Sequence, residues 1–294
     1  MGLRIGQINY SNCVPIFNML KKRHDCSKYI FSEGTPSELN KLISCGRIDI
    51  SPSSSIEYAI NPEKYLILPQ LSISSTGRVE SILLFSKLPI EELNKRTIAL
   101  TKASATSTVL LRILLKRLYN HSNIFVDTKM SLKGGLKRYP AYLLIGDDAL
   151  REAASCKLSM KTKNQNSKHR APNSELYIYD LGKMWHKLTG KPFVFALWIV
   201  RRDAAISQKG LVTRFYKDLL LSKEEAYINL KKIARDIKYY NNIDSERLIK
   251  YWKTISYDLG RKHIDGLLEF YRYAEKTGVI KRAPELNFFE PAAT

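Results

Sequence analysis

Three short polar segments of this chain carry side chains suited to holding a small anion. They are Asn9-Tyr10-Ser11-Asn12, Gly77-Arg78-Val79-Glu80-Ser81 and Ser104-Ala105-Thr106-Ser107. The amide of Asn12 offers donors and an acceptor without a charge, so it can orient a hydroxyl or a carboxylate. Ser104, Thr106 and Ser107 open a Leu-rich helix, where free backbone N–H groups and the helix dipole favour a carboxylate. On spacing alone, helix capping is favoured for the first segment, capping and anion binding are equally good explanations of the third, and a structural role in a strand is favoured for Ser81.

Other groups able to react are sparse. Asp147 and Asp148 follow an apolar run and suit general bases, but helix capping is favoured because carboxylates repel an anionic ligand. The five histidines fall in no triad-like context, and no Gly-rich nucleotide-binding motif is present. The residues alone therefore indicate a binding protein or enzyme for a small anion.

Alternating strand and helix patterns position these segments. Strands are predicted at 3–8, 29–33, 48–51, 65–68, 79–86, 97–100, 123–126, 141–145, 176–181 and 193–201. Helices separate most of these strands, and from about residue 203 only helices are predicted, at 208–222, 224–240, 245–256 and 261–276. Ligands of open α/β sheets bind just past the carboxyl ends of strands. The polar segments therefore point to one cleft between two α/β lobes.

Composition limits the classes of protein. A chain of 294 residues with 44% hydrophobic residues can fill two cores. No apolar run approaches the roughly 18 residues of a membrane span, and the start lacks a secretory signal pattern, so we expect a cytoplasmic protein with no membrane span. The four cysteines lack the paired spacing of a zinc site, so free thiols and no metal are expected.

The formal net charge of +20 raises the question of a nucleic-acid partner. No nucleic-acid-binding motif accompanies the charge, and its one local concentration, residues 157–170, is predicted as a polar loop. We therefore interpret the charge as a solvated basic surface and expect no nucleic-acid partner.

Six motifs resemble those of the chorismate dehydratase family of the futalosine route to menaquinone. They are RIGQINYSNCVP (4–15), GTPSELNKLISCGRIDISPSSSIEY (34–58), STGRVESILLFSKLP (75–89), TIALTKASATSTVLLRILL (97–115), LLIGDDAL (143–150) and YDLGKMWHKLTGKPFVFALW (179–198). The resemblance implies an α/β, two-lobed type II periplasmic-binding-protein-like fold with a C-terminal helical segment. It divides the chain into lobe I, residues 1–93 plus 196–294, and lobe II, residues 94–195, with the ligand cleft between them.

The same resemblance implies loss of water from chorismate to give 3-[(1-carboxyvinyl)oxy]benzoate. Removal of a ring proton and the ring hydroxyl creates a benzene ring, so aromatisation drives the reaction. The substrate is a small dianion, no metal or other cofactor is required, and the substrate's own enolpyruvyl carboxylate is the implied base.

Site residues carry over from the motifs. Asn12 and Ser81 are implied to orient the leaving hydroxyl and the enolpyruvyl carboxylate. The remaining substrate-binding residues are implied to be Ser104, Thr106 and Ser107, which hold a carboxylate, and Ser53, Ser54, Gly146 and Asp147, which line the cleft. Glu80, beside Ser81, would repel a dianion, so alternation along a strand is expected to turn it away from the cleft.

Two other functions fit the same features. The sister enzyme of the pathway, 1,4-dihydroxy-6-naphthoate synthase, shares the fold, and so do non-catalytic proteins that bind small anionic solutes. The sequence leaves the oligomeric state open.

Overall fold

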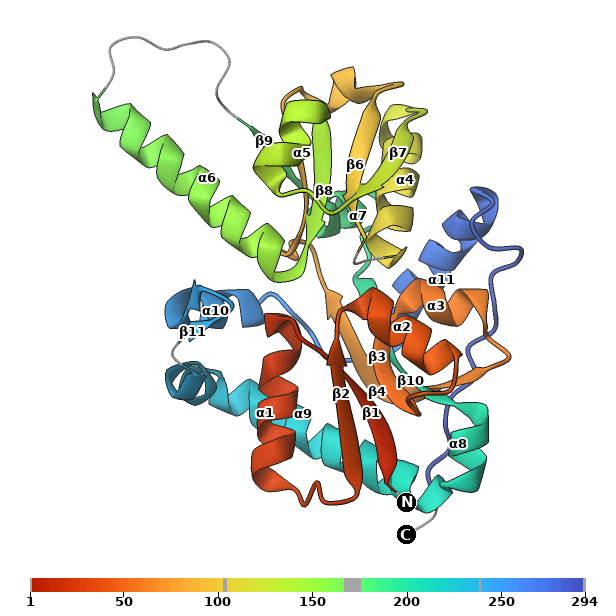
Figure 1. The fold of residues 1–294 in the computed structure, drawn as a ribbon. Helices are drawn as coiled ribbons and strands as arrows, with labels where there is room; N and C mark the ends of the chain where they lie inside the picture. The colour runs from red at the N-terminus through yellow and green to blue at the C-terminus, as the bar shows by residue number, and fades with distance from the viewer. Residues whose placement is uncertain (1, 103–104, 167–175, 238, 293–294) are drawn as a thin grey trace.

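The computed structural model describes residues 2–102, 105–166, 176–237 and 239–292, and it contains one five-stranded sheet in each of two lobes (Figure 1). The predicted α/β fold with two lobes and a helical C-terminal segment is thereby confirmed. The two sheets share one design. Each has four strands that run in one direction and a single strand that runs against them.

The lower lobe in Figure 1 contains the sheet β2-β1-β3-β10-β4. Its strands are β1 (Leu3–Ile8), β2 (Tyr29–Gly34), β3 (Ile50–Ser54), β4 (Tyr65–Ser75) and β10 (Phe193–Arg201). Its helices are α1 (Val14–Arg23), α2 (Pro36–Ser44), α3 (Ser55–Ile60), α8 (Arg202–Ser207), α9 (Lys209–Ile237), α10 (Ser245–Trp252) and α11 (Arg261–Lys276), with a short turn, η1 (Ser11–Cys13), between β1 and α1.

The upper lobe contains the sheet β7-β6-β8-β5-β9. Its strands are β5 (Ile82–Ser86), β6 (Thr97–Thr101), β7 (Ile124–Thr128), β8 (Ala141–Ile145) and β9 (Tyr177–Asp180). A short turn, η2 (Ile90–Leu93), and helices α4 (Ala105–Tyr119), α5 (Leu132–Arg138), α6 (Gly146–Asn166) and α7 (Leu181–Thr189) complete it.

The chain crosses between the lobes twice, between β4 and β5 and between α7 and β10. β5 pairs with β8 and β9 in the upper sheet, although the expected division assigned residues 1–93 to lobe I. β10 begins at Phe193, three residues before the expected return at 196. The first crossing segment, residues 76–81, is not part of the strand predicted at 79–86. It bends instead, with Gly77 and Glu80 at positive φ.

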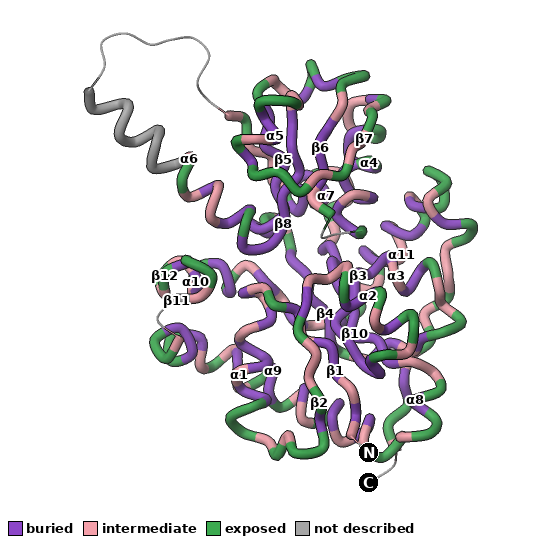
Figure 2. The backbone as a smooth tube through the Cα atoms, in the orientation of Figure 1, coloured by how far each residue is buried: buried purple, intermediate pink, exposed green. Residues whose placement is uncertain are grey.

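The inner strands of both sheets are buried because helices cover them (Figure 2). Every residue of β3 and β5 is buried, and so is β10 up to Val200. Strands covered on both faces need near-continuous apolar or small side chains, which is the pattern of β5 (ILLFS) and β10 (FVFALWIVR).

The helical C-terminal segment differs from the prediction in two places. The helices predicted at 208–222 and 224–240 form one continuous helix, α9. Lys223, at the predicted break, is buried and its Nζ lies 2.8 Å from Asp258 Oδ1, so the charge is paired rather than solvated. α10 ends at Trp252, and the turn that follows packs against β4 through backbone bonds between Ser74 and Ser256.

The basic segment predicted as a loop at 157–170 is helical as far as Asn166, where α6 ends; residues 167–170 lie outside the described part of the chain. In the described ranges, no helix combines the length and apolar character needed to cross a membrane.

Candidate functional site

A small cavity lies between the lobes and brings residues from all three polar segments together. Tyr10 and Asn12 come from the turn after β1, Ser81 from the first crossing segment, and Ser107 from the start of α4. The rest of its wall is formed by Ile8, Pro36, Ser54, Ile73, Ile82, Ile145, Gly146 and Ala196. The void measures about 50 Å³, whereas pockets for organic ligands usually measure about 300–1,000 Å³. The structure therefore shows the lobes drawn together around the cavity.

Asn12 sits in η1 and serves as no helix cap. The N-cap of η1 is Tyr10 and that of α1 is Cys13, neither with a side-chain cap bond. The Oδ1 atom of Asn12 is buried and has no hydrogen-bond partner. A buried polar atom without a partner costs free energy. A ligand hydroxyl or amide in the cavity would remove that cost.

Ser81 is 3% exposed and is bonded to both lobes. Its carbonyl accepts from the backbone N–H of Gly146 (2.7 Å), and its Oγ accepts from the Tyr251 hydroxyl (2.8 Å). The segment leading to it is fixed by Asp180, whose carboxylate accepts from the N–H groups of Val79 (3.2 Å) and Glu80 (2.8 Å). These bonds fix the position of Ser81 on the crossing segment.

Thr106 and Ser107 stand at the start of α4 but differ in their contacts. Thr106 Oγ1 accepts from the Ile56 N–H (3.2 Å) and lies 3.4 Å from Ser55 Oγ, so it contacts the start of α3 in the other lobe. Ser107 lines the cavity. Ser104, the third residue predicted for this carboxylate cradle, lies outside the described residues.

Asp147 connects the lobes and does not line the cavity. Its carboxylate accepts from the backbone N–H of Ser11 (3.0 Å), the Ser11 hydroxyl (2.5 Å) and Asn241 Nδ2 (2.5 Å). Burial raises the pKa of Asp147, although the bonds from Asn241 and Ser11 oppose that shift. In this conformation its oxygens are therefore occupied by protein donors rather than free for a substrate.

The β3 serines lie on opposite faces of the strand, because side chains alternate along it. Ser54 lines the cavity, whereas Ser53 does not. Ser53 Oγ is buried without a partner. The sequence pattern predicted both serines in a turn after a strand ending at 51, but β3 continues to Ser54.

Glu80 lies outside the cavity lining, as expected, but strand alternation is not the cause. It precedes β5 and has a φ of 60°, a conformation that L residues rarely adopt. Its carboxylate lies 3.7 Å from Arg247 Nη2 and 4.0 Å from Arg78 Nη2. Two cations thus draw this negative charge away from the site.

Sequence reasoning missed the support that the C-terminal segment gives to this site. Besides Tyr251, Trp252 donates from Nε1 to the carbonyl of Ser11 (2.8 Å), and the Tyr257 hydroxyl donates to the carbonyl of Asn12 (2.8 Å). All three aromatic side chains are at most 1% exposed. Their spacing resembles that of ordinary core residues, so no local pattern distinguishes them.

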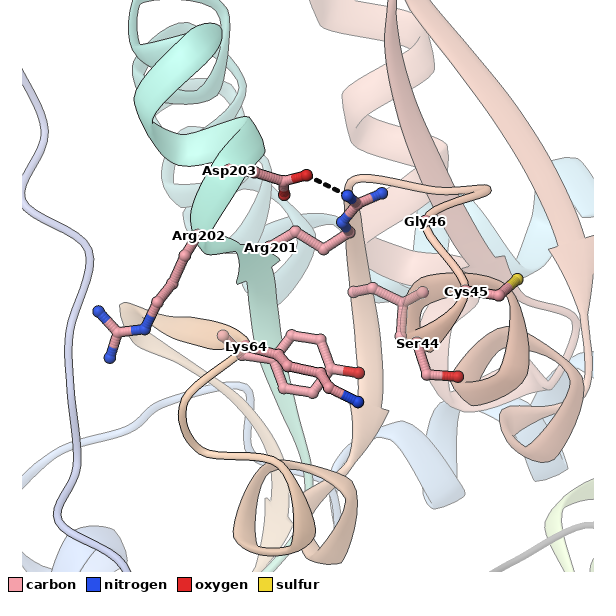
Figure 3. A pocket seen from close by; sticks show the side chains of 9 residues that line it. Ser44, Cys45, Gly46, Lys64, Arg201, Arg202 and Asp203 are labelled. Atoms are coloured by element: carbon pink, nitrogen blue, oxygen red, sulfur yellow. Dashed lines mark hydrogen bonds and ion pairs between the residues drawn. The ribbon is translucent and has the colours of Figure 1, made fainter.

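A larger hollow, of about 450 Å³, opens at the opposite ends of β3 and β10. Figure 3 shows its wall, in which Arg201 pairs with Asp203 beside Lys64 and residues 44–46. No residue predicted for the site lines it. Within the described ranges, no group of three or more His, Cys, Asp or Glu side chains is arranged to hold a metal ion.

Comparisons with known proteins identify the family of this chain. Residues 3–276 match the model of a family described as menaquinone biosynthesis. A relative from Thermus thermophilus named chorismate dehydratase is 32% identical over 204 residues, covering 68% of this chain and 70% of the relative. A second relative of that name, from Campylobacter jejuni, is 30% identical over 247 residues, covering 80% of this chain and 85% of its own.

Solved structures with low sequence identity share the fold. A protein from Archaeoglobus fulgidus superposes with a TM-score of 0.75 at 18% identity, covering 95% of this chain and 98% of its own. The periplasmic aliphatic sulphonate-binding protein of Escherichia coli gives a TM-score of 0.61 at 12% identity, with coverage of 100% and 93%. The fold is therefore that of periplasmic binding proteins.

Proposed function

This chain belongs to the menaquinone biosynthesis family, and we propose that it is a chorismate dehydratase, a hydro-lyase that converts chorismate to 3-[(1-carboxyvinyl)oxy]benzoate. In this role it performs the first step of the futalosine route. Two relatives that carry this name support the assignment over most of their lengths.

The observation that carries the proposal is the unpartnered amide oxygen of Asn12 in a cavity of neutral polar groups. Asn12, Ser54, Ser81 and Ser107 line it, and no Asp, Glu, Lys, Arg or His is among the lining residues that the structure describes. Hydroxyl and amide donors can bind a carboxylate without opposing it electrostatically. We assign Asn12 and Ser81 to orienting the leaving hydroxyl and the enolpyruvyl carboxylate, and Ser107 to holding a carboxylate.

Dehydration removes one ring proton and one hydroxyl, and the ring becomes aromatic as water leaves. Tyr10 is the only side chain with an acidic proton in the described lining, and burial raises its pKa far above neutrality, so it is no base. We therefore assign proton removal to the substrate's own enolpyruvyl carboxylate. The protein supplies orientation and hydrogen bonds to the leaving oxygen.

The chain's four cysteines are free thiols, which suits a reducing compartment. We place the reaction in the cytoplasm as part of the proposal.

Turnover of chorismate tests the function directly. Purified protein mixed with chorismate should lose the diene absorbance of the substrate and form an aromatic product lighter by one water, as mass spectrometry would show. Binding of chorismate without any product would instead make the protein a solute-binding protein.

A further inference from the structure

The C-terminal segment contacts the candidate site at three points through aromatic hydrogen-bond donors. Tyr251, Trp252 and Tyr257 donate to Ser81 Oγ, the Ser11 carbonyl and the Asn12 carbonyl, each at 2.8 Å. Two of these bonds hold main-chain atoms of η1. The Tyr251 bond differs because it reaches a side-chain oxygen assigned to the substrate.

We propose that Tyr251 is a positioning residue that fixes the Ser81 hydroxyl as a hydrogen-bond donor to the substrate. The inference rests on the proposed function, because it concerns how Ser81 meets chorismate. It assigns a catalytic contribution to α10, a helix that contributes no residue to the cavity lining.

The geometry defines the direction of the bond. A serine hydroxyl has one hydrogen and two lone pairs. The Tyr251 hydroxyl occupies one lone pair of Ser81 Oγ from the α10 side. The hydrogen of Ser81 is therefore free to point elsewhere, and Ser81 faces the cavity beside Asn12 and Gly146.

Tyr251 remains a donor across the working pH range. The residue is 1% exposed, and burial raises the pKa of its phenol well above the ordinary value. The side chain therefore stays protonated and cannot exchange its role with Ser81 by ionising. Donation into Ser81 Oγ also polarises the Ser81 O–H bond, because hydrogen bonds in a chain strengthen one another.

Tyr251→Phe tests the proposal, with Tyr142→Phe as the matched control. Tyr142 is also 1% exposed, and its hydroxyl donates one bond of 2.8 Å to the Met130 carbonyl in the upper lobe, away from the cavity. Both variants lose one buried tyrosine hydroxyl and should lower the melting temperature by similar amounts. Tyr251→Phe alone should lower kcat, by about tenfold, with KM changed less than about twofold.

A double-mutant cycle separates positioning from general loss of structure. Single-turnover rates are measured with enzyme in excess for wild type, Tyr251→Phe, Ser81→Ala and the double variant. If Tyr251 acts through Ser81, Tyr251→Phe should cost less than about twofold once Ser81 is alanine. An equal cost in both backgrounds, or wild-type kcat in Tyr251→Phe, would overturn the positioning role while leaving the dehydratase assignment intact. Absence of turnover in the wild-type enzyme would overturn both.

Discussion

Gly146→Ala should show whether the contact between the lobes matters for catalysis independently of the stability of the fold. Gly146 begins α6 in the upper lobe and has a φ of 61°. A Cβ at this position would lie 2.8 Å from Cδ2 and Cε2 of Tyr10, whose ring belongs to the lower lobe. Real Cβ atoms do not approach so closely, so the ring and the lobe that carries it must move.

The substitution has two free-energy costs. One applies in every folded conformation, and the other applies only when the lobes are together. The left-handed backbone costs an alanine roughly 1–2 kcal/mol whether the lobes are together or apart. The collision with Tyr10 adds about 1–3 kcal/mol, as overpacking usually does, only when the lobes are together. If catalysis requires that state, the second cost lowers kcat/KM by about 5- to 150-fold.

Gly190→Ala is the matched control. Gly190 follows α7 with a φ of 69°, but an added Cβ there meets nothing within 4 Å. Both variants should therefore lose similar stability in thermal unfolding, and only Gly146→Ala should lose kcat/KM toward chorismate. Equal kcat/KM in the two variants would show that the Tyr10–Gly146 contact is absent from the catalytic state, and the reasoning would be wrong.

Three further substitutions give separate outcomes. Asn12→Asp should lower kcat/KM by about a thousandfold, because a second negative charge about 4 Å from a carboxylate costs about 4 kcal/mol at an effective dielectric constant near 20; kinetics close to wild type would remove Asn12 from its role. Asp147→Asn should change how stability depends on pH. Because burial raises the pKa of Asp147 above its ordinary value of 3.8, the contribution of Asp147 to stability falls as pH rises through the interval between the two values, and the Asn variant lacks this fall. Urea unfolding from about pH 3 to pH 7 measures this difference, and parallel curves would contradict it. Trp252→Phe removes the donor to the Ser11 carbonyl and should lower the free energy of unfolding by about 1–3 kcal/mol in the same assay; an unchanged value would mean that this bond adds no net stability.

Much of the fold is predictable because local patterns define its strands and helices. Apolar residues recurring at helical spacing indicated α11, whose observed bounds, Arg261–Lys276, are the predicted ones. The break predicted in α9 was wrong because the partner of Lys223, Asp258, is 35 residues away. No local window contains the information that this charge is paired.

Local patterns also predicted part of the candidate site. The strand–turn–helix pattern indicated which segments face the cleft, and Asn12, Ser81 and Ser107 do meet there. It could not indicate that Thr106 and Asp147 bond to the opposite lobe, because Thr106 reaches Ile56 and Asp147 reaches Ser11 across 50 and 136 residues. Such pairings arise only when the lobes come together.

These pairings also bear on how a substrate can enter. The cavity of about 50 Å³ is bordered by Tyr10 against Gly146, and the Asp147–Ser11 bonds join the same two segments. A dianion with a six-membered ring exceeds that volume, so these contacts must separate before it binds and can form again around it. Ser81 is different, because Tyr251 holds its hydroxyl from within the lower lobe's own C-terminal segment. The Ser81 hydroxyl can therefore stay oriented toward the substrate while the cleft opens, provided that the crossing segment moves with α10.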